Sequence, residues 1–301
     1  MFEEPNPERR PPYPVAPSVS EHSGIIMQIK TIVVHLENAE LCSARLATAI
    51  EMADRHGAHL TGLFLSIEEF DGDIYGRSRG RGLRGARSDR LAAESAQAKA
   101  DFEGACKVAG LASYRFTTEI GTDEHDLEIH ARAADLLIVS DVQERTLEDR
   151  FVRGLPETLA LSSGLPVLVL PQEFEGAFNP KTVLIAWKSS REAVRAVRDN
   201  LGLLQAADSV ILLCVGDVEE SGQLPADQIL NFLKRHGVEA QVRHDYGETA
   251  PGKVILATAQ EIGAGAVVMG AHGHPSWRNL VLGNTTRYVL RHHRMPLLLS
   301  H

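Results

Sequence analysis

A unit of alternating strands and helices occurs twice in this chain, and this repeat constrains the fold more than any other feature. Short, continuous apolar runs stand at residues 32–34 and again at residues 183–185. Such runs are typical of strands that are buried on both faces of a parallel sheet. Each run is followed by a polar turn and then by apolar residues at helical spacing. This order predicts right-handed crossover connections and a parallel sheet in each half.

Four further strands are expected in each half. They cover residues 60–65, 114–120, 136–139 and 167–170 in the first half, and residues 210–215, 240–244, 266–269 and 297–299 in the second. In the second half, Ser189 and Glu192 form the S-x-x-E pattern of a capping box, which predicts where the first helix begins. The fold class is therefore α/β, with two tandem domains that each contain a five-stranded, mostly parallel sheet and helices on both faces.

The spacing of equivalent residues locates an insertion in the first half. Ser140 and Gly270 are 130 positions apart, whereas Glu37 and Lys188 are 151 positions apart, so about 21 extra residues lie between the second and fourth strands of the first half. They correspond to a Gly/Arg-rich insertion at about residues 70–90, which we expect to be a mobile loop. A sharper alternative is that its arginines contact RNA, phosphate or an acidic partner. These are Arg77, Arg79, Arg81, Arg84, Arg87 and Arg90.

The start of the chain differs in composition from the rest. Residues 1–26 hold six of the fourteen prolines and show no periodic apolar face, which predicts a disordered tail. Met27 stands just before the first strand, so it is a candidate for the natural start. The first domain is then expected over residues 27–172 and the second over residues 179–301.

Composition excludes several classes of protein. The formal net charge of −9 and the pI of about 5.8 argue against broad binding to nucleic acid or to an anionic membrane. No apolar run approaches the roughly 18 residues that a membrane-spanning helix requires. The three cysteines are far apart in the sequence, which argues against a disulfide framework or a cysteine zinc site. The expected location is the cytoplasm.

A set of glycines in the second half indicates a ligand site. A strand runs into Gly270-Ala271-His272-Gly273, and Gly283-Asn284-Thr285-Thr286 follows after nine intervening residues and opens a helix. Glycine at the carboxyl end of a strand lets backbone approach a ligand closely. The free N–H groups at a helix N-terminus favour phosphate. Both elements belong at the edge where open parallel sheets bind ligands.

This G-x2-G-x9-G spacing, placed after the fourth strand of a five-stranded unit, resembles the universal stress protein family. The resemblance covers about residues 28–301, as a tandem of two such domains. It implies a Rossmann-like fold of the HUP type, binding of an adenine nucleotide, dimer-like pairing of domains and a regulatory role in stress response. Asn284 stands where the family has Ser or Thr, with Thr285 and Thr286 as the next sources of a hydroxyl, and Lys188 stands where it often has an acidic residue.

The resemblance implies one nucleotide site, in the second domain. Its ligand is expected to be ATP, with AMP or another adenine nucleotide as alternatives and Mg²⁺ arriving with ATP; the sequence predicts no metal site of its own. The first domain is degenerate, because Ser140, Gln143 and Arg153 replace its glycines. The expected cofactor-binding residues are Gly270, Gly273, Gly283, Asn284, Thr285, Lys188, Val215 and Arg278.

Three functions remain open from the sequence. The first is a stress-response regulatory protein that binds a nucleotide and acts on an unidentified protein partner. The second is a slow ATP hydrolase, although no P-loop and no catalytic residues are evident. The third is a structural or interaction protein without a ligand. The last strand of each half, at residues 167–170 and 297–299, is a candidate pairing edge for a pseudo-dimer of domains, and a homodimer of the chain is a further expectation.

Overall fold

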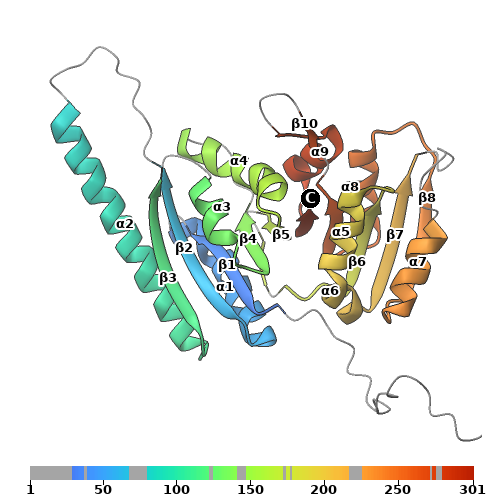
Figure 1. The fold of residues 1–301 in the computed structure, drawn as a ribbon, viewed down its shortest axis with the longest axis horizontal. Helices are drawn as coiled ribbons and strands as arrows, with labels where there is room; N and C mark the ends of the chain where they lie inside the picture. The colour runs from blue at the N-terminus through green and yellow to red at the C-terminus, as the bar shows by residue number, and fades with distance from the viewer. Residues whose placement is uncertain are drawn as a thin grey trace, which may run out of the picture.

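The computed structural model describes residues 29–36, 39–67, 80–121, 125–140, 147–171, 174–176, 178–216, 226–271, 273–275 and 280–301. The expected N-terminal tail therefore lies outside the described residues. Among the residues that are described, the helices are all too short or too polar to cross a membrane. The two halves of the chain lie side by side and share one sheet of ten strands (Figure 1).

The first half alternates strands and helices as expected from its sequence pattern. Its elements are β1 (Thr31–Leu36), α1 (Ala39–His56), β2 (His59–Ile67), α2 (Gly80–Val108), β3 (Tyr114–Gly121), α3 (His125–Ala131), β4 (Leu136–Ser140), α4 (Leu147–Ser162) and β5 (Val167–Leu170).

The second half repeats this order, with two helices between its first two strands and a short hairpin before its last helix. Its elements are β6 (Thr182–Trp187), α5 (Arg191–Asp199), α6 (Leu201–Ala206), β7 (Ser209–Val215), α7 (Ala226–Arg235), β8 (Ala240–Asp245), α8 (Pro251–Glu261), β9 (Ala266–Gly270), β10 (Gly273–Pro275), β11 (Leu280–Leu282), α9 (Asn284–His292) and β12 (Leu297–Ser300).

The sheet order is β3-β2-β1-β4-β5-β12-β9-β6-β7-β8, so each half contributes five strands in the same internal order. Within each half the five strands of this sheet are parallel. The halves join where β5 and β12 pair antiparallel, with Leu168 opposite Leu298. The α/β fold class and the expected pairing of the two last strands are confirmed.

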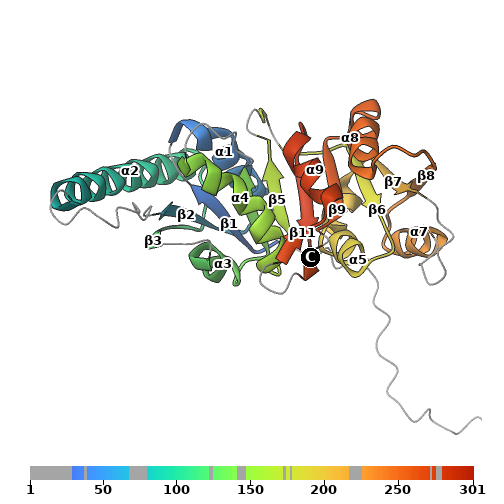
Figure 2. The ribbon, with the colours of Figure 1, turned by 90° about the horizontal axis from the view of Figure 1, so that it is seen from above.

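Helices cover both faces of the sheet, because alternate strand residues point to opposite sides. One core packs residues of α1, α2, α5 and α7 against the sheet, and the other packs residues of α4, α8 and α9. Across the junction of the halves, α4 and α9 are neighbours (Figure 2). There the guanidinium of Arg287 lies 3.7 Å from the carboxylate of Glu157.

The first helix of the second half begins one residue later than the capping pattern predicted. Ser190, not Ser189, is the N-cap: its backbone is extended (φ −137°, ψ 159°), and its side chain accepts a hydrogen bond of 3.2 Å from the N–H of Ala193. Glu192 therefore stands second in α5, too early to complete a capping box. It is buried instead, and it accepts a 3.1 Å hydrogen bond from Arg191.

The Gly/Arg-rich insertion was wrongly predicted to be a loop over the residues from Gly80 onward, which are helical. They belong to α2, which has 29 residues, whereas its counterpart α7 has ten. The extra residues thus largely lengthen a helix. Its later turns are held by Phe102 and Cys106, both fully buried. Arginine, alanine and glutamate are good helix formers, so the helix extends back through the arginines despite the glycines.

Candidate functional site

The candidate site lies where the order of strands in the second half reverses. β6 pairs with β7 on one side and with β9 on the other. The chain leaves the carboxyl ends of these three strands at Lys188, Val215 and Gly270. In open α/β sheets, ligands bind outside the carboxyl ends of the strands at this switch point. Three of the expected site residues therefore share one edge of the sheet.

Gly270 ends β9 under the first turn of α5. A Cβ atom at this position would lie 2.6 Å from the amide nitrogen of Ala193 and 2.7 Å from the carbonyl carbon of Glu192. Both are backbone atoms, which cannot rotate away as a side chain can. The packing of α5 thus requires glycine here, a structural reason in addition to the ligand approach that the sequence pattern indicated.

The hairpin of β10 and β11 brings the second and third glycines together. Gly273 begins β10 and pairs with Leu282, the residue just before Gly283. This antiparallel pairing was not predicted, because each strand has only three residues and no pattern of its own. His272 and Arg278 lie outside the described residues.

The third glycine precedes α9, and its own backbone makes the cap. Gly283 is the N-cap (φ −63°, ψ 152°), without a hydrogen bond from a side chain to the first turn. Asn284, which stands where the family has Ser or Thr, is the first helical residue and is exposed. Thr285 is half-buried, whereas Thr286 is only 2% exposed. The hydroxyl that was expected from either threonine is therefore accessible only at Thr285.

Lys188 and Val215 complete the described part of the site. Lys188 is exposed in the turn between β6 and α5, where its carbonyl accepts a 2.6 Å hydrogen bond from the N–H of Ser190. Val215 is half-buried at the end of β7. The next residue, Gly216, has φ of +91° and donates its N–H to the carbonyl of Asp245 at 2.8 Å. The positive φ favours glycine at this turn.

The C-terminal end of α9 carries two histidines, His292 as its last residue and His293 as its C-cap. The Nδ1 atom of His292 lies 2.8 Å from the carbonyl oxygen of Tyr288. His293 is only 7% exposed, and burial lowers its pKa to about 4. His293 is therefore neutral at pH 7 and adds no charge there. No cluster of three potential metal ligands occurs within the described part of the chain.

The first half has Ser140 where the second has Gly270. Ser140 ends β4 and is buried. Residues 141–146, which include Gln143, lie outside the described residues. The described end of β4 thus carries a side chain at the position where β9 has none.

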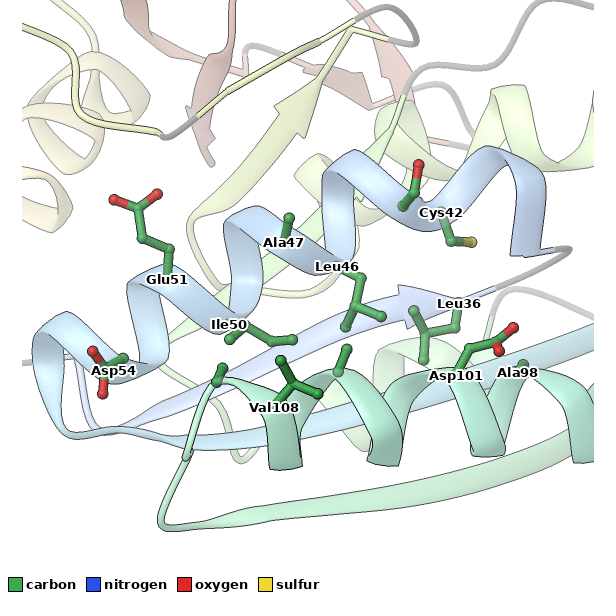
Figure 3. Close-up of a pocket in the computed structure, with 13 residues that line it drawn as sticks. Leu36, Cys42, Leu46, Ala47, Ile50, Glu51, Asp54, Ala98, Asp101 and Val108 are labelled. Atoms are coloured by element: carbon green, nitrogen blue, oxygen red, sulfur yellow. The ribbon is translucent and has the colours of Figure 1, made fainter.

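A cleft of about 640 Å³ lies away from these glycines, between α1 and α2 (Figure 3). None of the residues that line it is among the predicted site residues. The feature of the sequence that could have indicated this cleft is a series of alanines at roughly helical spacing on α2. These are Ala98, Ala105 and Ala109, which line the cleft.

The strand order, the crossover connections and the helix that begins at the switch point define a Rossmann-like α/β protein. Residues 179–301 match the universal stress protein family. The family model thus covers the second half of the chain, and the resemblance stated from the glycine spacing is confirmed for those residues.

Individual relatives agree with this placement. A universal stress protein of Synechocystis sp. is 27% identical over 153 residues, which are 50% of this chain and 49% of that protein. The chain thus matches about half the length of this curated relative.

Solved structures extend the likeness of fold to both halves. A universal stress protein from Archaeoglobus fulgidus has a TM-score of 0.69 at 17% identity, over 90% of this chain and 95% of that one. A universal stress protein solved in complex with cAMP is similar at 19% identity over 41% of this chain and 98% of that one, with a TM-score of 0.31; its nucleotide is a property of that protein.

Proposed function

We propose that the second domain binds an adenine nucleotide, with ATP as the leading ligand, and that the protein uses this binding in a regulatory role during stress response. The universal stress protein domain at residues 179–301 supports the role in stress response. The position of the α9 N-terminus at the carboxyl edge of the sheet supports the nucleotide.

The observation that carries the proposal is the combination of this helix start with a glycine cap. Gly283 has no side chain that could cover the first turn of α9. The N–H groups of Asn284 and Thr285 therefore begin a helix whose positive dipole end is accessible to an anion. A phosphate group fits this chemistry, because it accepts hydrogen bonds from backbone N–H groups and is favoured by the dipole.

Lys188 adds a positive charge at the same edge of the sheet. It is exposed, and it follows β6, the strand on one side of the switch point. An ammonium group suits a phosphate, which it contacts as a point charge. In this proposal the triphosphate lies toward Lys188 and the start of α9, and Mg²⁺ arrives with ATP. The side-chain amide of exposed Asn284 offers a further donor.

A pair of lysine variants tests the proposal by calorimetric titration with ATP and with adenosine. Lys188→Ala is expected to weaken ATP binding about tenfold, since a hydrogen bond to a charged group contributes on the order of 1.5–3 kcal/mol, and to leave adenosine binding unchanged. Lys181→Ala is the matched control: Lys181 stands just before the same strand, at its amino end, and pairs with Asp208 at 3.7 Å. Absence of ATP binding by the unmodified protein at millimolar concentration refutes the proposal, as does equal weakening by both variants.

A further inference from the structure

The cleft between α1 and α2 has an apolar interior. Leu46 and Ile50 point into it from α1, and Leu36 of β1 also lines it (Figure 3). On the α2 side the lining side chains are small, apart from Val108, which is 92% exposed. A volume of about 640 Å³ is within the range of about 300–1,000 Å³ that small-molecule sites occupy.

The second half of the chain provides an internal comparison for this cleft, because α5 and α7 repeat α1 and α2. Ala47 and Arg198 are 151 positions apart, the same spacing as Glu37 and Lys188 at the front of the two halves. At this spacing Leu46 of α1 corresponds to Val197 of α5, and both are buried.

The ends of α2 and α7 set the second correspondence. After α2, the N–H of Leu111 donates to the carbonyl of Cys106, and after α7 the N–H of Val238 donates to that of Leu233. Each helix is followed by a glycine with positive φ, Gly110 at 69° and Gly237 at 77°. Counting back from these equivalent turns places Ala105 at the position of Phe232 and Ala109 at the position of His236.

In the second half, the corresponding positions carry large side chains in contact. The guanidinium of Arg198 lies 4.9 Å from the centre of the Phe232 ring, and that ring lies 4.5 Å from the ring of His236. In the first half all three positions are alanine, and Ala47, Ala105 and Ala109 line the cleft. The first half therefore lacks an aromatic ring and a cation at the place where the second half supplies both.

The charges around the cleft favour a cation. Its charged lining residues are Glu51, Asp54 and Asp101, and none of the described side chains that line it is basic. Glu51 is already engaged, since its carboxylate pairs with Arg55 and accepts a hydrogen bond from the N–H of Phe178. Asp54 on α1 and Asp101 on α2 (Figure 3) are both exposed, and one carboxylate oxygen of Asp101 accepts a 2.8 Å hydrogen bond from the side-chain amide of Gln97.

We infer that this cleft binds a small amphipathic cation, with an aromatic or aliphatic body over Leu46 and Ile50 and an ammonium or guanidinium group near Asp101 or Asp54. Such a ligand supplies to the first half the two groups that Phe232 and Arg198 supply to the second. The carboxylates at the rim of the cleft attract a cationic ligand more strongly than a neutral or anionic molecule of the same size. The inference concerns the first half of the chain and is independent of the nucleotide site.

Tryptamine is a suitable probe, with indole-3-propionate as an anion that has the same ring. Calorimetric titration of the full chain is expected to give a Kd of about 1 mM or tighter for tryptamine, as suits a ligand of this size, and binding at least tenfold weaker for indole-3-propionate. Asp101→Asn is expected to reduce the preference for the cation about fivefold. Equal binding of the two probes, or binding of neither, overturns the inference.

Variants that restore the residues of the second half locate the binding. Ala105→Phe is expected to weaken tryptamine binding more than tenfold by filling the cleft. Ala100→Phe is its matched control, because Ala100 is exposed on the same helix and does not line the cleft. Ala47→Arg offers a second obstruction at an exposed position and serves if Ala105→Phe does not fold.

Two outcomes of these variants contradict the inference. If Ala105→Phe is folded and still binds tryptamine as the unmodified chain does, the ligand lies elsewhere. If sedimentation shows that Ala105→Phe instead dissociates an oligomer, a second copy of this chain covers the cleft and no small cation is its occupant.

Discussion

Replacing Gly270 by alanine tests why glycine ends β9. The added Cβ would lie 2.6 Å from the amide nitrogen of Ala193 and 2.8 Å from the Cβ of Glu192. Relief of this overlap requires α5 to move away from β9. Overpacking a well-packed region typically costs about 1–3 kcal/mol, and contact with backbone places the expected loss of stability near the top of that range, at about 3 kcal/mol.

Gly104→Ala is the matched control for this substitution. Gly104 lies within α2 and is exposed, and a Cβ atom there would have no heavy atom within 4 Å. Alanine inside a helix is more favourable than glycine by roughly 0.5–1 kcal/mol. The same chemical change is therefore expected to stabilise the chain at one site and to destabilise it at the other.

Urea unfolding, followed by tryptophan fluorescence and by circular dichroism, measures both effects. Trp187 is buried at the end of β6, beside β9, so its fluorescence reports on the second half. The reasoning is refuted if Gly270→Ala is as stable as the unmodified protein. If that variant is stable but no longer binds ATP, approach of the ligand and not the packing of α5 is the reason for the glycine.

Three further predictions follow from buried groups and caps. The pKa of His293 is about 4 in the folded chain and about 6.5 when unfolded, so the free energy of unfolding is expected to fall by about 3 kcal/mol as the pH drops from 6.5 to 4. His293→Gln should remove this pH dependence in urea unfolding. If the variant keeps the same dependence on pH as the unmodified chain, His293 is not its cause. Ser190→Ala is expected to cost about 1 kcal/mol through the lost cap of α5, whereas no loss would mean that the cap is not needed. Burial raises the pKa of the Cys106 thiol to about 11, so native protein at pH 8 should not react there with iodoacetamide, and labelling detected by mass spectrometry would refute its burial.

The strands could be predicted because their pattern is local. Runs such as Val183 to Ile185 are apolar at every position, and they form strands that are buried on both faces of the sheet. The glycine spacing likewise predicted where a helix begins, since Gly283 and Asn284 stand at the start of α9. The conformation of the Gly/Arg-rich segment depends on residues farther along the chain. Residues from Gly80 onward are helical because the helix is anchored at Phe102, more than twenty residues later.

The repeat, the α/β class and the position of the glycines are properties that the amino-acid sequence determined by itself, because they depend on periodicity and on spacing along the chain. Only the tertiary structure decided which atoms surround those residues. The closeness of Gly270 to α5, and the cleft beside Ala105, depend on how helices and strands distant in sequence pack together. Small residues permit such approaches, but the packed partners determine whether the resulting space is filled, as beside Phe232, or left open.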